Sequence, residues 1–246
     1  MCQFIILLFF TLFLPVLAYI PVYPTNSTGA TTADASTIIL QWYSNGSYVQ
    51  NISFQIAGQG STGINKGALV HFSEEGVNNA TAPTSTPWIA LISCDNNSTN
   101  ASLDTDIFEL AHEKGAVSAL LYSLYSKACV INPGYSDRLF DIFSSPDPAS
   151  SHLIEYQFSQ TGQHVLSSYD SAQLNASANV ITESINAGYP VSSGYLLAAL
   201  TARNATATST TSATTQPSMK SGCNPCSTPF PLMVLYVAIA SVLVLL

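Results

Sequence analysis

Two continuous apolar segments with a helical pattern between them constrain the fold of this chain more than any other feature. Residues 88–93 and 116–122 contain one serine each and otherwise only apolar or aromatic side chains, which is typical of strands covered on both faces. Between them, Asp104 can cap a helix, Asp106 adds negative charge to its first turn and Gly115 can end it. The expected buried face of this helix comprises Leu103, Ile107, Leu110 and Ala111. The strand–helix–strand order predicts a βαβ unit, and therefore an α/β fold.

Further strands and one more helix are expected on both sides of this unit. Short apolar runs or alternating apolar and polar residues predict strands at 37–43, 48–56, 67–72, 139–143 and 195–200. The Ser-Asn-Gly-Ser sequence at 44–47 is a hairpin signal between the first two. Apolar spacing from Pro148 to about 168 predicts a second helix. About 200 residues remain between the apolar ends of the chain, which is enough for one domain with its own core.

The N-terminal apolar run at residues 4–17 predicts a signal peptide. It is too short to span a bilayer comfortably, it contains Pro15, and Ala18 follows at a position that suits signal peptidase. We therefore expect residues 1–18 to be removed. Residues 19–35, rich in Pro, Thr, Asn and Ser, would then form a leader segment. A retained membrane helix is the alternative.

The C-terminal hydrophobic tail at 229–246 predicts attachment to a membrane. No Lys or Arg follows it, whereas a stop-transfer helix is normally flanked by basic residues on its cytosolic side. The pattern fits a glycosylphosphatidylinositol (GPI) signal, which combines small residues, a polar spacer and an apolar tail. Ser221, Gly222 or Asn224 would accept the lipid, within a Ser/Thr-rich stalk and spacer at 204–228. The alternative is a transmembrane helix in a chain whose cytosolic part is missing.

Glycosylation acceptors and a low charge content indicate a secretory-pathway protein. Only 6 Lys and Arg stand against 14 Asp and Glu, and this net charge of −8 argues against binding to nucleic acid or anionic lipid. Attached glycans would keep such a weakly charged surface hydrated. We expect the cell surface or an endomembrane, with the domain on the lumenal or extracellular side. The Asn-x-Ser/Thr acceptors are Asn26, Asn45, Asn51, Asn79, Asn96, Asn97, Asn100, Asn175 and Asn204.

The five cysteines predict one disulfide bond. Cys2 belongs to the signal peptide, and Cys223 and Cys226 form a spacer motif beside the tail that is too small for a zinc site. Cys94 and Cys129 are then the one pair inside the domain, and an oxidising compartment would join them. Two free buried thiols are the alternative.

The segment 86–122 also follows the pattern of a known family. Its apolar strand at 88–92, Cys94, amphipathic helix at 107–111, Gly-Ala at 115–116 and second apolar strand at 119–122 occur in that order. In this it resembles the core of the protease-associated (PA) domain. The resemblance covers 36–203 and implies a PA-like β-sandwich or open barrel with a βαβ unit and about two flanking helices. Residues 40–43, 67–74, 123–132 and 140–145 are similar to fungal PA-like membrane proteins in which a cytosolic RING ubiquitin-ligase domain follows, but no RING-type Cys/His series follows here.

Several side chains suggest chemistry, and each has a structural alternative. His112-Glu113 begins a zinc-protease motif, but Ala116 stands where the second His is needed. His71 is a candidate base or a structural strand residue. Asp104, Asp106 and Glu109 suggest either a calcium site or helix capping. Tyr122, Tyr125 and Trp88 suggest either a peptide groove or packing.

Two functional hypotheses follow. The first is a non-catalytic interaction domain held on a membrane, which binds peptide, protein or glycan and needs no cofactor or metal. The second is the lumenal half of a RING-type ubiquitin-protein ligase. We predict no catalytic residues, because neither a nucleophile with its base nor a set of metal ligands is evident.

Overall fold

The computed structural model describes residues 21–27, 29, 33–95, 105–161, 166–188 and 190–206. The described residues all belong to one compact unit that ends at Thr208. The predicted signal peptide, the tail at 229–246, the lipid-attachment residues and the CNPC motif lie outside the described residues. Within the described ranges, every helix is too short or too polar to be a candidate membrane span.

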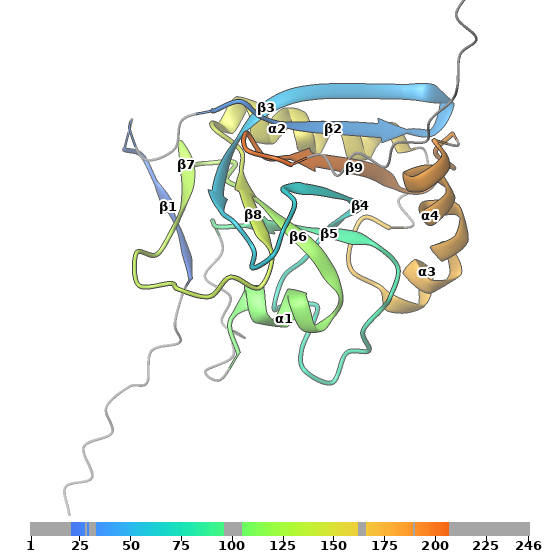
Figure 1. The fold of residues 1–246 in the computed structure, drawn as a ribbon, viewed down its shortest axis with the longest axis horizontal. Helices are drawn as coiled ribbons and strands as arrows, with labels where there is room; N and C mark the ends of the chain where they lie inside the picture. The colour runs from blue at the N-terminus through green and yellow to red at the C-terminus, as the bar shows by residue number, and fades with distance from the viewer. Residues whose placement is uncertain are drawn as a thin grey trace, which may run out of the picture. The chain divides into compact units, whose positions relative to one another are not determined.

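Seven strands form a closed barrel in the order β2-β3-β8-β6-β5-β4-β9 (Figure 1). Their bounds are β2 Ser36–Trp42, β3 Gly46–Ile56, β4 Ile64–His71, β5 Trp88–Ser93, β6 Ala116–Tyr122, β8 Asp141–Ser144 and β9 Leu196–Thr201. β4, β5, β6 and β8 run parallel to their neighbours in that group, while β2, β3 and β9 pair antiparallel. The α/β prediction is confirmed. The sequence predicted a β-sandwich or an open barrel, whereas the observed barrel is closed, because β2 pairs with β9.

The predicted βαβ unit is present as β5, α1 (Ile107–Glu113) and β6, with β5 and β6 in parallel register. The predicted N-cap was wrong. Asp106, and not Asp104, precedes the helix and accepts hydrogen bonds from the N–H groups of Phe108 and Glu109. Gly115 lies between α1 and β6 with φ +92°, and a β-carbon there would collide with the carbonyl oxygen of Thr84. Asp104 and Leu103 lie outside the described residues.

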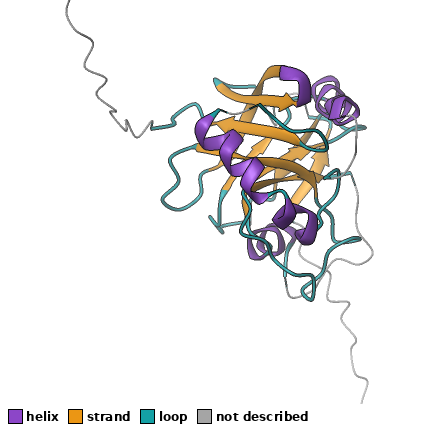
Figure 2. Ribbon diagram, turned by 90° about the vertical axis from the view of Figure 1, so that its right-hand side faces the viewer, coloured by secondary structure: helices purple, strands orange, loops and turns teal. Residues whose placement is uncertain are grey.

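The core consists of two buried clusters, one on each side of the parallel strands. The inner cluster takes side chains from all seven barrel strands, and α2 (Pro148–Phe158) adds Ile154 and Phe158 to it. The outer cluster packs α1, α3 (Ser171–Ala176) and α4 (Ala178–Ala187) against the other face. Figure 2 shows the helices outside the strands. Burial on both faces explains why β5 and β6 are continuous apolar runs.

The structure contains elements that the sequence did not predict. β1 (Val22–Thr25), in the expected leader segment, pairs antiparallel with β7 (Ala128–Ile131) as a separate two-stranded sheet. Four α-helices are described where about two were expected, since α3 and α4 were missed. The helix predicted from Pro148 to about 168 ends at Phe158, before a 3₁₀ turn η2 at Ser159–Thr161. The hairpin turn is confirmed: Ser44 and Asn45 both have positive φ angles, as tight hairpins require.

Candidate functional site at the carboxyl ends of the parallel strands

A pocket opens where the parallel strands β4, β5 and β6 end. Ligands of α/β proteins commonly bind outside the carboxyl ends of parallel strands, because the loops that diverge there leave a crevice. Here the pocket encloses about 180 Å³. Its wall combines apolar, aromatic, hydroxyl and acidic side chains: His71, Phe72, Ser73, Glu74, Glu75, Leu91, Ser93, Ile107 and Tyr122. We call it the strand-end pocket.

His71, the last residue of β4, lies at the centre of a hydrogen-bond network beside this pocket. Its Nε2 is 2.7 Å from Oε1 of Glu155 on α2, and its Nδ1 is 2.7 Å from the carbonyl oxygen of Ser167. The ring also packs against Phe158, with 4.4 Å between ring centroids. Because the His71 and Glu155 side chains are only 30% and 25% exposed, water screens this pair less than a surface ion pair.

The protonation state of His71 follows from its two partners. A backbone carbonyl and a carboxylate both accept hydrogen bonds, so both ring nitrogens must carry a proton to satisfy them. Burial alone would lower the pKa of His71, but the hydrogen bond and charge of Glu155 and the Ser167 carbonyl raise it above its ordinary value of 6.5. The geometry therefore describes an imidazolium–carboxylate ion pair.

Tyr122, the last residue of β6, adds a phenol to the same pocket. Burial, followed by the negative charge of Glu155, raises the pKa of this phenol strongly, so the group stays protonated. Ser93, the last residue of β5, also lines the pocket. Three adjacent parallel strands thus each end in a polar residue, and all three residues line the strand-end pocket.

The loop after β6 is fixed and presents an aromatic side chain to solvent. The Asp95 carboxylate accepts hydrogen bonds from the Ser123 hydroxyl and the N–H of Leu124, and Ser123 Oγ accepts from the N–H of Ser126. The predicted disulfide between Cys94 and Cys129 is confirmed and joins the end of β5 to β7. Tyr125 lies within this loop, yet its side chain is 85% exposed.

The structure separates the side chains that the sequence singled out. Tyr122 lines the strand-end pocket and Tyr125 follows it in the adjoining loop, whereas Trp88 is fully buried, which agrees with the packing alternative for this residue. Asp106 caps α1, while Glu109 and His112 are exposed on it. Within the ranges the structure describes, no group of three His, Cys, Asp or Glu residues could hold a metal ion.

The glycosylation acceptors that are described all lie on the surface. Each of the six has an exposed side chain, and they are spread over several elements: Asn26, Asn45, Asn51, Asn79, Asn175 and Asn204. The amide oxygen of Asn175 accepts a hydrogen bond from Thr84, which leaves its nitrogen available for a sugar. Asn96, Asn97 and Asn100 lie outside the described residues.

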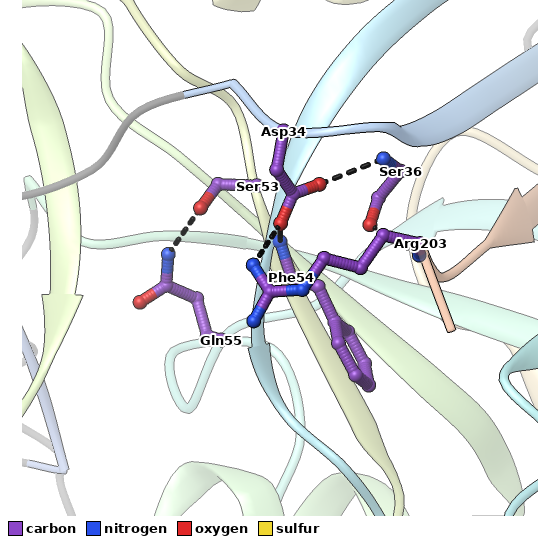
Figure 3. A network of polar contacts seen from close by, with 6 residues as sticks. All are labelled: Asp34, Ser36, Ser53, Phe54, Gln55 and Arg203. Atoms are coloured by element: carbon purple, nitrogen blue, oxygen red, sulfur yellow. Dashed lines mark hydrogen bonds and ion pairs between the residues drawn. The ribbon is translucent and has the colours of Figure 1, made fainter. Parts of the chain in front are cut away.

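The opposite end of the barrel carries a different polar cluster. Asp34, just before β2, accepts hydrogen bonds from the N–H groups of Ser36 and Phe54 (Figure 3). It also forms an ion pair with Arg203, which lies just after β9. The N–H of Arg203 in turn donates to the Ser36 hydroxyl. This cluster fastens the two ends of the barrel sequence to each other. It lies at the start of β4, because Thr201 of β9 pairs with Ile64.

Sequence reasoning missed Glu155, Ser93 and Ser167 as members of the site. Glu155 lies on the predicted second helix, 84 residues from His71, and no local pattern links the two. The position of Ser93 at the end of an apolar run could have suggested it, since strand ends are where α/β folds collect polar groups.

Comparison with protein-family models finds none that matches this sequence, and comparison with curated proteins finds no match either.

Proposed function

We propose that this chain is a non-catalytic, membrane-anchored interaction domain of the PA type, which binds a peptide segment outside the cytosol through the strand-end pocket. The observation that carries the proposal is the convergence of apolar, aromatic and acidic side chains in that pocket, and the loop that follows its Tyr122 carries the exposed Tyr125. Concave sites with an apolar lining and few polar groups are the usual form of a binding site. Exposed tyrosines on fixed loops often supply much of the binding energy at interfaces.

Side-chain capture fits this fold better than strand addition. A closed barrel offers no strand edge to an incoming peptide. In the separate two-stranded sheet, β1 contains Pro24, which has no N–H for a further strand, and the Cys129 carbonyl on β7 already accepts a hydrogen bond from Ser144. A peptide would therefore bind mainly by inserting a side chain.

The acidic residues of the pocket wall favour a basic side chain as the one that the peptide inserts. Glu74 and Glu75 line the strand-end pocket together with the apolar Leu91 and Ile107, and the chain carries a net charge of −8. A lysine or arginine side chain matches this lining, because its aliphatic stem can pack on apolar walls while its charged end meets the carboxylates. We therefore propose a basic peptide as the ligand class.

Fluorescence anisotropy of labelled, N-acetylated peptides tests this proposal on the purified full chain. A peptide with a central Lys should bind more tightly than the same peptide with Gln or Glu. Glu75→Gln should weaken the Lys peptide about fivefold, as expected for one exposed charge contact of about 1 kcal/mol. Tyr125→Ala should weaken all peptides without lowering the melting temperature.

Glu183→Gln is the matched control, since Glu183 is exposed on α4 and does not line the strand-end pocket. This variant should bind like wild type. Equal affinity for the Lys and Glu peptides, or equal losses in the Glu75 and Glu183 variants, would reject the pocket as the binding site.

The membrane anchor is a separate part of the proposal. Its support is the apolar tail at 229–246, with small residues at 221–224 before it. Treatment of intact cells with a phosphatidylinositol-specific phospholipase should release the protein into the medium. Retention on the membrane after this treatment would instead favour a transmembrane helix.

A further inference from the structure

We propose that His71 and Glu155 form a pH-operated clamp: the imidazolium holds helix α2 against the strand-end pocket, and loss of the Nε2 proton opens the contact to Glu155. The clamp regulates the same pocket to which the proposed function assigns peptide binding. Only its effect on ligand affinity rests on that function. The clamp itself can be tested without a ligand.

His71 joins three segments of the chain. It ends β4, its Nε2 contacts Glu155 on α2, and its Nδ1 contacts the Ser167 carbonyl. Both partner atoms can only accept hydrogen bonds. A neutral imidazole has one N–H and one lone pair, so one of the two contacts would bring a lone pair to within 2.7 Å of an oxygen. Deprotonation must therefore break one contact.

The backbone decides which contact breaks. The Ser167 carbonyl also accepts from the backbone N–H of His71 at 3.0 Å, and the N–H of Tyr169 donates back to the His71 carbonyl at 3.1 Å. These bonds form a parallel bridge between His71 and Ser168 that does not depend on the imidazole. The Nδ1 proton is therefore retained, the Nε2 lone pair faces the Glu155 carboxylate, and the α2 contact opens.

The charged and titratable groups near His71 lie on three segments of the chain. Glu155 on α2 contacts it directly. Glu74 and Glu75, after β4, line the same pocket, and Tyr122 at the end of β6 packs its ring edge 6.2 Å from the imidazole centroid. His152, one turn before Glu155 on α2, is exposed. Burial and the negative charge of Glu155 keep the phenol of Tyr122 protonated.

The direction of the pH effect follows from the pKa. Because the folded state raises the pKa of His71 above 6.5, the clamp contributes its full stability below that value. The contribution is lost as the pH rises through the folded-state pKa. The clamp is thus closed in acidic solution and open in alkaline solution, and opening also removes a positive charge from the pocket wall.

An NMR titration of the full chain, following the His71 imidazole resonances, tests the clamp. We expect a pKa above 6.5 that moves down in Glu155→Gln and stays in place in His152→Gln, the matched control on the same helix. Hydrogen exchange of the α2 amides, corrected for the intrinsic pH dependence, should accelerate through the same pH range in wild type and not in Glu155→Gln. A His71 pKa at or below 6.5, or one that Glu155→Gln leaves unchanged, would overturn the proposal.

Peptide binding then distinguishes the clamp from the proposed function. If both hold, the Lys peptide should bind more tightly above the His71 pKa than below it, and this dependence should vanish in His71→Gln. Failure of every peptide to bind would reject the proposed function while the NMR and exchange results still support the clamp. Binding without a shifted His71 pKa would reject the clamp alone.

Discussion

The two ends of the barrel are each fastened by an ion pair, but the two pairs differ in what they can sense. Asp34 and Arg203 close the end at which β4 starts, and Glu155 and His71 lie at the end at which it finishes. Arginine keeps its charge at every pH that a folded protein meets, whereas histidine titrates near neutrality. The same kind of contact is therefore permanent at one end and adjustable at the other.

The Asp34 carboxylate also titrates in a different pH range from His71. Burial would raise the pKa of Asp34, but hydrogen bonds from Ser36 and Phe54 and the charge of Arg203 outweigh it and hold the pKa below 3.8. The contribution of Asp34 is therefore complete above that value and is lost only as the pH falls through its lowered folded-state pKa. Between the folded-state pKa of Asp34 and that of His71, the ion pairs at both ends of the barrel are therefore formed.

The largest expected effect comes from removing the disulfide at the adjustable end. Cys94 and Cys129 lie 35 residues apart, and on the chain-entropy model a loop of this length contributes about 4 kcal/mol. The double variant Cys94→Ser, Cys129→Ser should lower the melting temperature by roughly 10 °C in calorimetry. Reduction of the wild type should produce the same loss. An unchanged melting temperature, or two thiols that react with an alkylating reagent in the native protein, would refute the bridge.

An intermediate effect is expected at the permanent end. Asp34→Ala leaves the N–H groups of Ser36 and Phe54 without their acceptor, which should cost about 2 kcal/mol in urea unfolding. The variant should also lose less stability than wild type when the pH is lowered from 5 to 3. If both proteins show the same acid sensitivity, Asp34 does not carry the acid dependence assigned to it.

The smallest effect is expected for Arg203→Gln. The Arg203 side chain is 57% exposed, and exposed ion pairs contribute about 0.5 kcal/mol. The backbone N–H of Arg203 keeps its bond to Ser36, so the end stays fastened. Unfolding at low and high salt should show that the small loss disappears at high salt. A loss as large as that of Asp34→Ala would mean that the guanidinium, and not the backbone bonds, fastens this end.

The part of the fold that the sequence predicted is the part with local patterns. Strands β5 and β6 are buried on both faces, so they stand out as apolar runs, and Gly115 marks the turn between α1 and β6. The β2–β3 hairpin likewise carries its own turn residues. By contrast, α3 and α4 bury few apolar side chains, such as Leu174 and Ile181, among Ser, Asn and Ala. Only the N-cap Asp170 could have indicated their start.

Long-range pairing could not be predicted in the same way. No local pattern in Ser36–Trp42 indicates that it pairs with Leu196–Thr201, so closure of the barrel could not be predicted from the sequence. The same holds for the site. His71 and Tyr122 were candidates from their residue type, but the partner that defines their chemistry, Glu155, comes from another element. For Trp88 the sequence left a groove and packing open, because an aromatic residue at the start of an apolar run fits either, and its burial shows that it packs in the core.

Closure of the barrel by its first and last strands has a consequence for biosynthesis. β2 cannot pair with β9 until the chain up to Thr201 has left the ribosome, so closure of the barrel is a late step of folding. Such non-local pairing makes folding slow. Until β9 arrives, the edges of β2 and β4 that pair with it lack their backbone partners, so the unfinished barrel exposes strand edges that the folded protein covers.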